Sequence, residues 1–381
     1  MTRMWPVNSY SHIGQCIIFS LGPCVLVPLL LGGCTNSAVR DEESVRESVM
    51  LHEMPISADL PCSLQFESAG VALHSDIQDA IPDPDWWVAR GPGGQYYTAT
   101  PDGGRILVWT PMGEFGRTIG RPGPGPGELG LGSFPFVGED GLIHVHETGN
   151  GRWSTFDPQG EFLESTTTRH FAYPPISRTV ALIDSGRFLM GSPVGGAQFS
   201  IVNRDGTVLE FGPATQNERP LTYPGGGTFW AAPAPGSSMD TYDLEEWSLA
   251  GELIRVIRRH APWQNDADTV TSRPDRPTFE IYSGADGHLL LVALVRDPDR
   301  TTAAPGELWY EVIDPESPAV IASEQVLIDQ HGPPIIGIFP GTNSGFRGRM
   351  DSVGLRIIDI MRYNLLPSHG SEDMPDSHAC S

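Results

Sequence analysis

Short apolar runs that alternate like β-strands, separated by Gly, Asp and Pro turns, recur along most of the chain. Residues 136–162 show the pattern most completely. They contain three predicted strands and two tight turns: strands at 142–146, 153–156 and 161–163, and turns at Asp140-Gly141 and 157–160. Strands of this length joined by such turns are typical of antiparallel hairpins. The pattern therefore predicts an all-β protein.

The hairpin pattern repeats with a nearly constant period. Equivalent turn glycines at positions 113, 160, 206 and 251 are separated by 47, 46 and 45 residues. A second set, at 94, 141 and 186, is separated by 47 and 45 residues. Repeats of about 40–50 residues with several strands each indicate the blades of a β-propeller. Six units are counted from these positions: Trp86, Phe136, Val180, Phe229, Ile281 and Ile336.

The first and last units predict how the ring closes. Apolar strands at 64–66 and 71–73 precede the first unit, whereas the last unit ends near 355–361 without an obvious fourth strand. We predict a six-bladed β-propeller of four-stranded antiparallel blades in which the N-terminal strand completes the last blade, because closure removes open sheet edges. The expected organisation is a signal peptide (1–33), a polar tether (34–60), the propeller (61–366) and a flexible tail (367–381).

Residues 1–33 have the features of a secretion signal. Arg3 is their only charge, residues 16–31 are apolar, and Leu31-Gly32-Gly33-Cys34 fits a lipobox. In a lipobox, small residues precede a cysteine that becomes lipidated and N-terminal. The sequence therefore predicts a lipoprotein anchored through Cys34.

An uncleaved membrane anchor is the alternative interpretation of this segment. Pro23 and Pro28 interrupt its short apolar run, which favours the lipoprotein. Thr35 follows the cysteine. In lacking an Asp at this position, the chain resembles lipoproteins that are sent to the outer membrane. We expect the protein in the cell envelope, on the outer-membrane or periplasmic side.

Charge and turn composition narrow the partners and the class of protein. The net charge is −23, and −24 once residues 1–33 with Arg3 are removed. Such acidity excludes nucleic acid and argues against contact with anionic membrane surfaces, so we expect membrane contact through the lipid alone. The 44 Gly and 35 Pro residues fall at the periodic turns, so they mark blade boundaries in an ordered domain.

Two stretches resemble a known family. The corner at 147–162 resembles an NHL-type repeat, with Glu147, Asn150 and Arg152 where that repeat tends to carry acidic, Asn and Arg residues. Residues 119–129 resemble the Gly-Arg-x-Gly-x-Gly-Pro-Gly-Glu-Phe linker of bacterial six-bladed β-propeller lipoproteins of the NHL-repeat or TolB-like type. The resemblance covers about residues 62–366 and implies the same six-bladed fold.

Two cysteines remain after the signal and the lipidated position are set aside. Cys62 lies at the start of the predicted closing strand, and Cys380 lies in a tail rich in Ser, His, Asp and Glu. In an oxidising compartment they can pair and tie that strand to the tail. The sequence leaves the pairing open, because it carries no geometry.

His144 and His146 alternate on one predicted strand, so both rings point to the same face, a spacing that can bind a metal. A metal would need a third ligand from another blade, and nothing marks which histidine would supply it. We therefore favour a hydrogen-bonded or partly exposed strand face, and expect no cofactor.

The candidate binding face consists of Arg121, Arg152 and Trp153, because Arg and Trp are enriched where proteins bind partners. The structural alternative is that Arg152 braces its corner and that Trp153 packs between blades. Arg121 lies on the Gly- and Pro-rich loop.

The sequence favours a binding or scaffolding module over an enzyme. No Gly-x-Ser-x-Gly elbow, His-Glu-x-x-His helix or Cys-x-x-Cys pair occurs in the chain. The expected partner is a protein, peptide or sugar at the propeller face. One alternative is an enzyme similar to NHL lyases, lactonases or strictosidine synthase, with a metal in the channel. The other is a surface protein that binds sugars or peptides.

Overall fold

The computed structural model describes residues 49–54, 60–75, 82, 87–167, 179–191, 197–214, 218–233, 241–261, 278–295, 307–327, 335–352, 355–368 and 380. The chain divides into two units, Met1–Glu47 and Ser48–Ser381, and all described residues belong to the second. The predicted signal peptide, Cys34 and most of the predicted tail lie outside the described residues. Within them, no helix is both long and apolar enough to cross a membrane.

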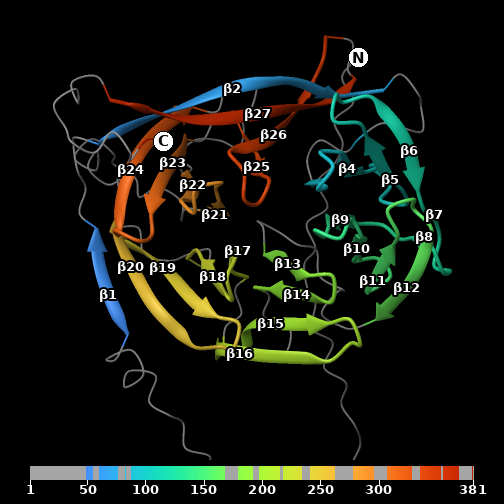
Figure 1. The fold of residues 1–381 in the computed structure, drawn as a ribbon, viewed down its shortest axis with the longest axis horizontal. Helices are drawn as coiled ribbons and strands as arrows, with labels where there is room; N and C mark the ends of the chain where they lie inside the picture. The colour runs from blue at the N-terminus through green and yellow to red at the C-terminus, as the bar shows by residue number, and fades with distance from the viewer. Residues whose placement is uncertain are drawn as a thin grey trace, which may run out of the picture. The chain divides into compact units, whose positions relative to one another are not determined.

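The described strands form six sheets around a common axis, which is a six-bladed β-propeller, as the sequence predicted (Figure 1). Each blade has four antiparallel strands with the first one innermost. Blade one contains β3 (Val88–Arg90), β4 (Tyr96–Ala99), β5 (Ile106–Trp109) and β6 (Phe115–Ile119). Blade two contains β9 (Ser133–Val137), β10 (Ile143–Glu147), β11 (Arg152–Phe156) and β12 (Phe162–Thr167). Blade three contains β13 (Val180–Asp184), β14 (Arg187–Met190), β15 (Ala197–Asn203) and β16 (Val208–Ala214).

The other three blades follow the same plan. Blade four contains β17 (Leu221–Gly225), β18 (Thr228–Ala231), β19 (Thr241–Ser248) and β20 (Leu253–His260). Blade five contains β21 (Thr278–Ser283), β22 (Leu289–Val295), β23 (Glu307–Asp314) and β24 (Ala319–Leu327). Blade six contains β25 (Gly337–Ile338), β26 (Ser344–Met350), β27 (Arg356–Pro367) and β2 (Cys62–Leu73).

The N-terminal strand closes the ring. In blade six, β2 is the outermost strand and pairs antiparallel with β27, from Cys62 opposite Pro367 to Leu73 opposite Ile358. The strand that opens the propeller thus lies beside the strand that ends it, and the predicted closure is confirmed. Ring closure leaves no blade with an unpacked face.

The apolar core lies between neighbouring blades, because both faces of each sheet are covered. On β10, Ile143 and Val145 pack with blade one, where they contact a cluster that includes Ile106 and Val108. The alternate residues of β10 face blade three, where the His144 ring lies 6.2 Å from that of Phe188. Each blade therefore buries its faces only against its neighbours, as expected for a repeat architecture.

One strand was not predicted. β1 (Met50–Met54) pairs parallel with β20 and becomes a fifth, outermost strand of blade four, from Met50 opposite Arg255 to Met54 opposite Arg259. Met54 is buried against Tyr242 and Ile257, whereas Met50 is exposed. The predicted tether of 34–60 is therefore wrong over these five residues. They form a strand because the outer edge of β20 offers backbone hydrogen bonds and because the Met54 side chain is buried.

The start of the fourth unit was also placed wrongly. Phe229 lies on β18, the second strand of its blade, and the inner strand is β17. Three consecutive glycines, 225–227, end β17 and form the turn to β18, and all three have a positive φ. This glycine run obscures the short inner strand in the sequence, and the stronger apolar run after it, which contains Phe229, resembles the first strand of the unit.

Candidate ligand site in the axial channel

The inner strands of the blades surround a cavity of about 820 Å³ on the propeller axis. It is lined by β3, β9, β13, β17, β21 and β25 and by the turns that follow most of them. Cavities of about 300–1,000 Å³ are the size in which proteins bind small organic ligands. The channel is therefore the candidate site.

The wall of the cavity combines apolar side chains with polar groups, and each blade contributes to it. Every blade contributes at least one buried apolar side chain, and one from each blade in turn is Trp87, Phe136, Val180, Leu221, Ile281 and Ile338. Smaller and partly exposed residues such as Ala89 and Ala181 lie between them on the same strands. Such a wall favours an apolar ligand body, because burial against it removes apolar surface from water.

Hydroxyl groups join two of the inner strands. The Thr222 hydroxyl of β17 lies 3.2 Å from the Ser283 hydroxyl of β21 and accepts a hydrogen bond of 3.0 Å from the Ser283 backbone N–H. Tyr282, also on β21, donates a 3.0 Å hydrogen bond to the carbonyl of Ile336, just before β25. These bonds hold three neighbouring inner strands in register and fix the shape of the wall.

Charged side chains gather at one end of the cavity. The inner strands all run in the same direction, so the turns that follow them meet at one mouth. Four charged residues line the cavity there, all exposed: Arg90, Glu139, Asp140 and Asp184. Burial raises the pKa of Asp184, but hydrogen bonds from Arg187 and from the Gly186 backbone outweigh it and hold that pKa below its ordinary value. Three acids and one base thus face this mouth.

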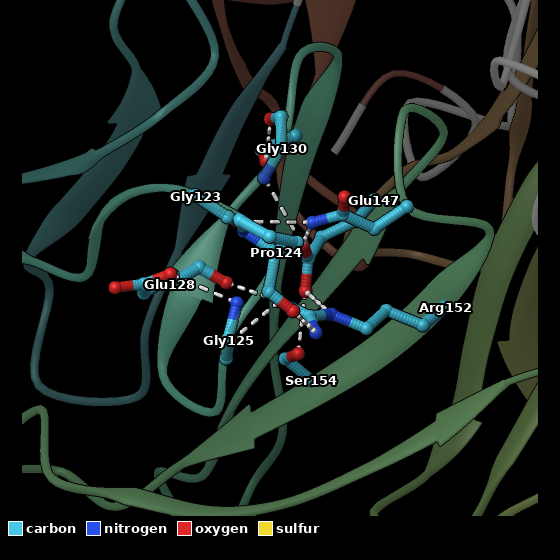
Figure 2. A network of polar contacts seen from close by, with 10 residues as sticks. Gly123, Pro124, Gly125, Glu128, Gly130, Glu147, Arg152 and Ser154 are labelled. Carbon is cyan, nitrogen blue, oxygen red and sulfur yellow. Dashed lines mark hydrogen bonds and ion pairs between the residues drawn. The ribbon is translucent and has the colours of Figure 1, made fainter.

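Arg152 is a structural residue, so its place in the predicted binding face is wrong. Its side chain is buried, and its Nε lies 2.8 Å from Oε1 of Glu147. Its terminal nitrogens donate to the carbonyls of Pro124 (2.8 Å), Gly125 (3.1 Å) and Glu128 (Figure 2). One guanidinium therefore holds the whole Gly- and Pro-rich loop against blade two.

Glu147 completes this network from the other side. Its carboxylate is fully buried and accepts hydrogen bonds from the Gly130 backbone (3.1 Å), Asn150 (2.7 Å) and the Ser154 hydroxyl (Figure 2). The loop crosses from β6 to β9 and contains a short parallel ladder of β7 (Arg121–Pro122) and β8 (Glu128–Leu129). The residues of the NHL-like corner thus act as a brace.

Trp153 is also buried and not part of a surface, so this prediction is corrected too. Its ring centroid lies 4.1 Å from that of Phe188 in blade three, and its Nε1 donates a 2.9 Å hydrogen bond to Nδ1 of His144. The side chain packs between blades, the structural alternative weighed for it. Of the three predicted residues, only Arg121 is at the surface, with 77% of its side chain exposed and a 2.9 Å ion pair to Glu128.

His144 and His146 are both buried and face the joint between blades two and three. The predicted exposure of this strand face is therefore wrong, and the predicted hydrogen bonding holds for His144. Among the described residues, no group of three or more His, Cys, Asp and Glu side chains could hold a metal ion. Burial lowers the pKa of His144 from 6.5 to about 4.

This shift predicts a loss of stability in mild acid. The folded state keeps His144 neutral while the unfolded state takes up a proton, so stability falls as the pH drops from 6.5 towards 4. The loss from this group alone is up to about 3 kcal/mol, since one pKa unit corresponds to about 1.4 kcal/mol. Urea unfolding of wild type and His144→Gln between pH 7.5 and 4 measures it. Parallel curves for the two proteins would contradict the assignment.

Cys62 and Cys380 form a disulfide in the structure, with their Cα atoms 5.8 Å apart. The bond joins the first residue of β2 to the penultimate residue of the chain, and Cys62 is buried beside Leu64 and Tyr363. It therefore ties the closing strand to the tail.

Sequence reasoning missed the acidic mouth of the channel. The sequence pattern predicts Asp140 only as a turn residue, and Asp184 belongs to no predicted site. A signal was nevertheless present, since both precede the glycine of the first turn in their units, at the positions Asp140-Gly141 and Asp184-Ser185-Gly186. Because the first strand of every blade is the inner one, the turn after it always lies at the channel.

Comparison with known proteins supports the fold. No protein-family model matches the chain, and no curated protein matches it in sequence. A Bacteroides fragilis protein assigned as exported has 10% identity and a TM-score of 0.53, covering 82% of this chain and 99% of its own. A DUF4221 family member from Bacteroides vulgatus has 11% identity and a TM-score of 0.50, covering 80% and 99%. At these identities, the likeness shows a shared propeller fold.

Proposed function

We propose that the protein is an extracytoplasmic binding module, anchored by a lipid on Cys34, that holds an organic ligand in its axial channel. The observation that carries the proposal is the cavity of about 820 Å³ with an apolar side chain from every blade. The lipobox at 31–34 supports the anchor. The exported assignment of the Bacteroides fragilis neighbour is consistent with the location.

The finer family assignment, an NHL-repeat or TolB-like lipoprotein, is part of the same proposal. It is supported by the corner that contains Glu147, Asn150 and Arg152, and by the loop at 119–129. In the structure these two stretches contact each other, since Asn150 donates to the Gly123 carbonyl at 3.3 Å. The resemblance therefore extends over one connected structural unit.

Binding of a neutral aromatic probe tests the channel as a ligand site. We expect 1-naphthalenemethanol to bind the full chain in phosphatidylcholine nanodiscs, measured by calorimetry against empty nanodiscs. Ala181→Trp and Ala89→Trp narrow the cavity from different blades and should each weaken binding about tenfold or more, because they fill the space that the ring occupies.

Leu163→Trp is the matched control, because Leu163 lies on β12, an outer strand, and is exposed. It adds the same indole away from the cavity and should leave probe binding unchanged. Thermal unfolding of each variant verifies that it folds. Absence of saturable binding to wild type, or equal binding by all three folded variants, would refute the channel as the site.

A further inference from the structure

The charged residues of the cavity lining lie in one sector. Among the residues that the structure describes, those that carry charge and line the cavity come from blades one to three: Arg90, Glu139, Asp140 and Asp184. The corresponding lining residues from blades four and six, 224–225 and 340–342, carry no charge. Along the described lining, a ligand in the channel therefore meets apolar side chains from every blade, and carboxylates at one side of one end.

Asp140 and Asp184 lie in the same sector, on either side of the joint between blades two and three. Both carboxylates act electrostatically on the buried His144 ring of that joint. A Cβ placed on Gly138 would lie 2.6 Å from Oδ1 of Asp140 and 3.9 Å from Nε2 of His144. That Nε2 is fully buried and has no hydrogen-bond partner within the described residues. The His144 ring and the Asp140 carboxylate therefore both lie close to Gly138, which lines the cavity.

The two carboxylates that blade two places at the mouth, Glu139 and Asp140, make few contacts within the fold. Glu139 makes no hydrogen bond or ion pair within the described residues, and Asp140 accepts one hydrogen bond through Oδ1, 3.0 Å from the Leu142 backbone N–H. Asp184, in contrast, is paired with Arg187 at 2.8 Å. Within the described residues Arg90 forms no ion pair with Glu139 or Asp140, so both carboxylates remain available to a ligand.

We propose that the channel binds an amphiphilic cation, a ligand with an apolar body and a basic amine that lies beside Glu139 and Asp140. This inference rests on the channel being the ligand site. The apolar side chains of the six blades would take up the body, and the ammonium group would donate hydrogen bonds to the two carboxylates. Charge-assisted hydrogen bonds of this kind set orientation and specificity.

Three naphthalene probes that share one ring system test the proposal: 1-naphthylmethylammonium, 1-naphthalenemethanol and 1-naphthoate. At low salt we expect the ammonium to bind the full chain about three- to tenfold more tightly than the alcohol, and the carboxylate to bind most weakly. Because the acids are exposed, about 1 M NaCl should largely remove the preference. Equal affinity of ammonium and alcohol at low salt would overturn the proposal.

The double variant Glu139→Gln/Asp140→Asn assigns the preference to these acids. It keeps the acceptor for Leu142 and should bring the ammonium to within about twofold of the alcohol while alcohol binding stays constant. The control Glu161→Gln/Glu324→Gln removes two exposed charges away from the channel and should retain the preference. A preference unchanged in the first variant would overturn the proposal. Binding of the alcohol to Ala181→Trp tests the channel as the ligand site, independently of charge. Failure of the channel proposal can therefore be distinguished from failure of the proposed preference for a cation.

Discussion

Replacement of Arg152 by Met is expected to lower the free energy of unfolding by about 3–5 kcal/mol, because it leaves a charged partner buried and unpaired. That partner is Glu147, whose carboxylate is fully buried and loses its 2.8 Å contact with Arg152 Nε. The carbonyls of Pro124, Gly125 and Glu128 lose their donors as well. Urea unfolding of wild type and variant measures the difference.

A second substitution separates the unpaired charge from lost packing. In Arg152→Met/Glu147→Leu, no charge remains buried at this site, so a good part of the lost stability should return. Arg121→Ala is the surface control: its pair with Glu128 is exposed and should contribute less than about 1 kcal/mol. If Arg152→Met were no more destabilising than Arg121→Ala, the bracing role of Arg152 would be wrong.

Loss of the Cys62–Cys380 bond is expected to cost about 2–5 kcal/mol, because a disulfide restricts the unfolded chain more when it closes a longer loop. This bond spans 318 residues and so encloses the entire propeller. It also holds the end of the chain on the strand that closes the ring. Urea unfolding of Cys62→Ser/Cys380→Ser should therefore begin at a lower concentration than that of wild type.

Reduction provides the matched experiment. Dithiothreitol should shift the unfolding midpoint of wild type to that of the double serine variant and leave the variant itself unchanged. Mass measurement before and after reduction and alkylation reports whether the bond is present. Two free thiols in protein purified from an oxidising compartment would contradict the pairing.

The fold was predictable because its strongest determinant, the turn between strands, is local. Gly113 and Gly160 both have a positive φ, which glycine adopts without strain, so their spacing records the blade period directly. The strands predicted at 142–146 and 153–156 differ from β10 and β11 by at most one residue at either end.

Burial of polar residues could not be predicted in the same way. In an open sheet, alternation separates a buried face from an exposed one, but both faces of a propeller blade are covered. The polar positions of β10 and β11, which include His144 and Arg152, therefore face a neighbouring blade or loop and not solvent. Their partners, such as Phe188 and the Pro124 carbonyl, lie on other blades or loops, and the sequence carries no record of that contact.

The candidate site eluded prediction for a related reason. A channel is made by strands from six blades, and each blade contributes only a few apolar side chains and, in most blades, a short turn. No segment by itself has the composition of a binding site. The first strand of each repeat is the innermost strand of its blade. Applied to every repeat, this rule would have predicted Asp140 and Asp184 at the same mouth of the channel.

Under the lipidation proposed at Cys34, the position of β1 sets the length of chain between the lipid and the propeller. Because β1 pairs with blade four from Met50 onward, the chain between Cys34 and the propeller is residues 35–49, which are 15 residues (49 − 34). The predicted tether would have placed 26 residues, 35–60, between them. At about 3.3–3.6 Å per extended residue, 15 residues reach at most about 55 Å. A lipidated propeller would therefore stay within this distance of the membrane surface. It would bind ligands released near the membrane before ligands in the rest of the compartment.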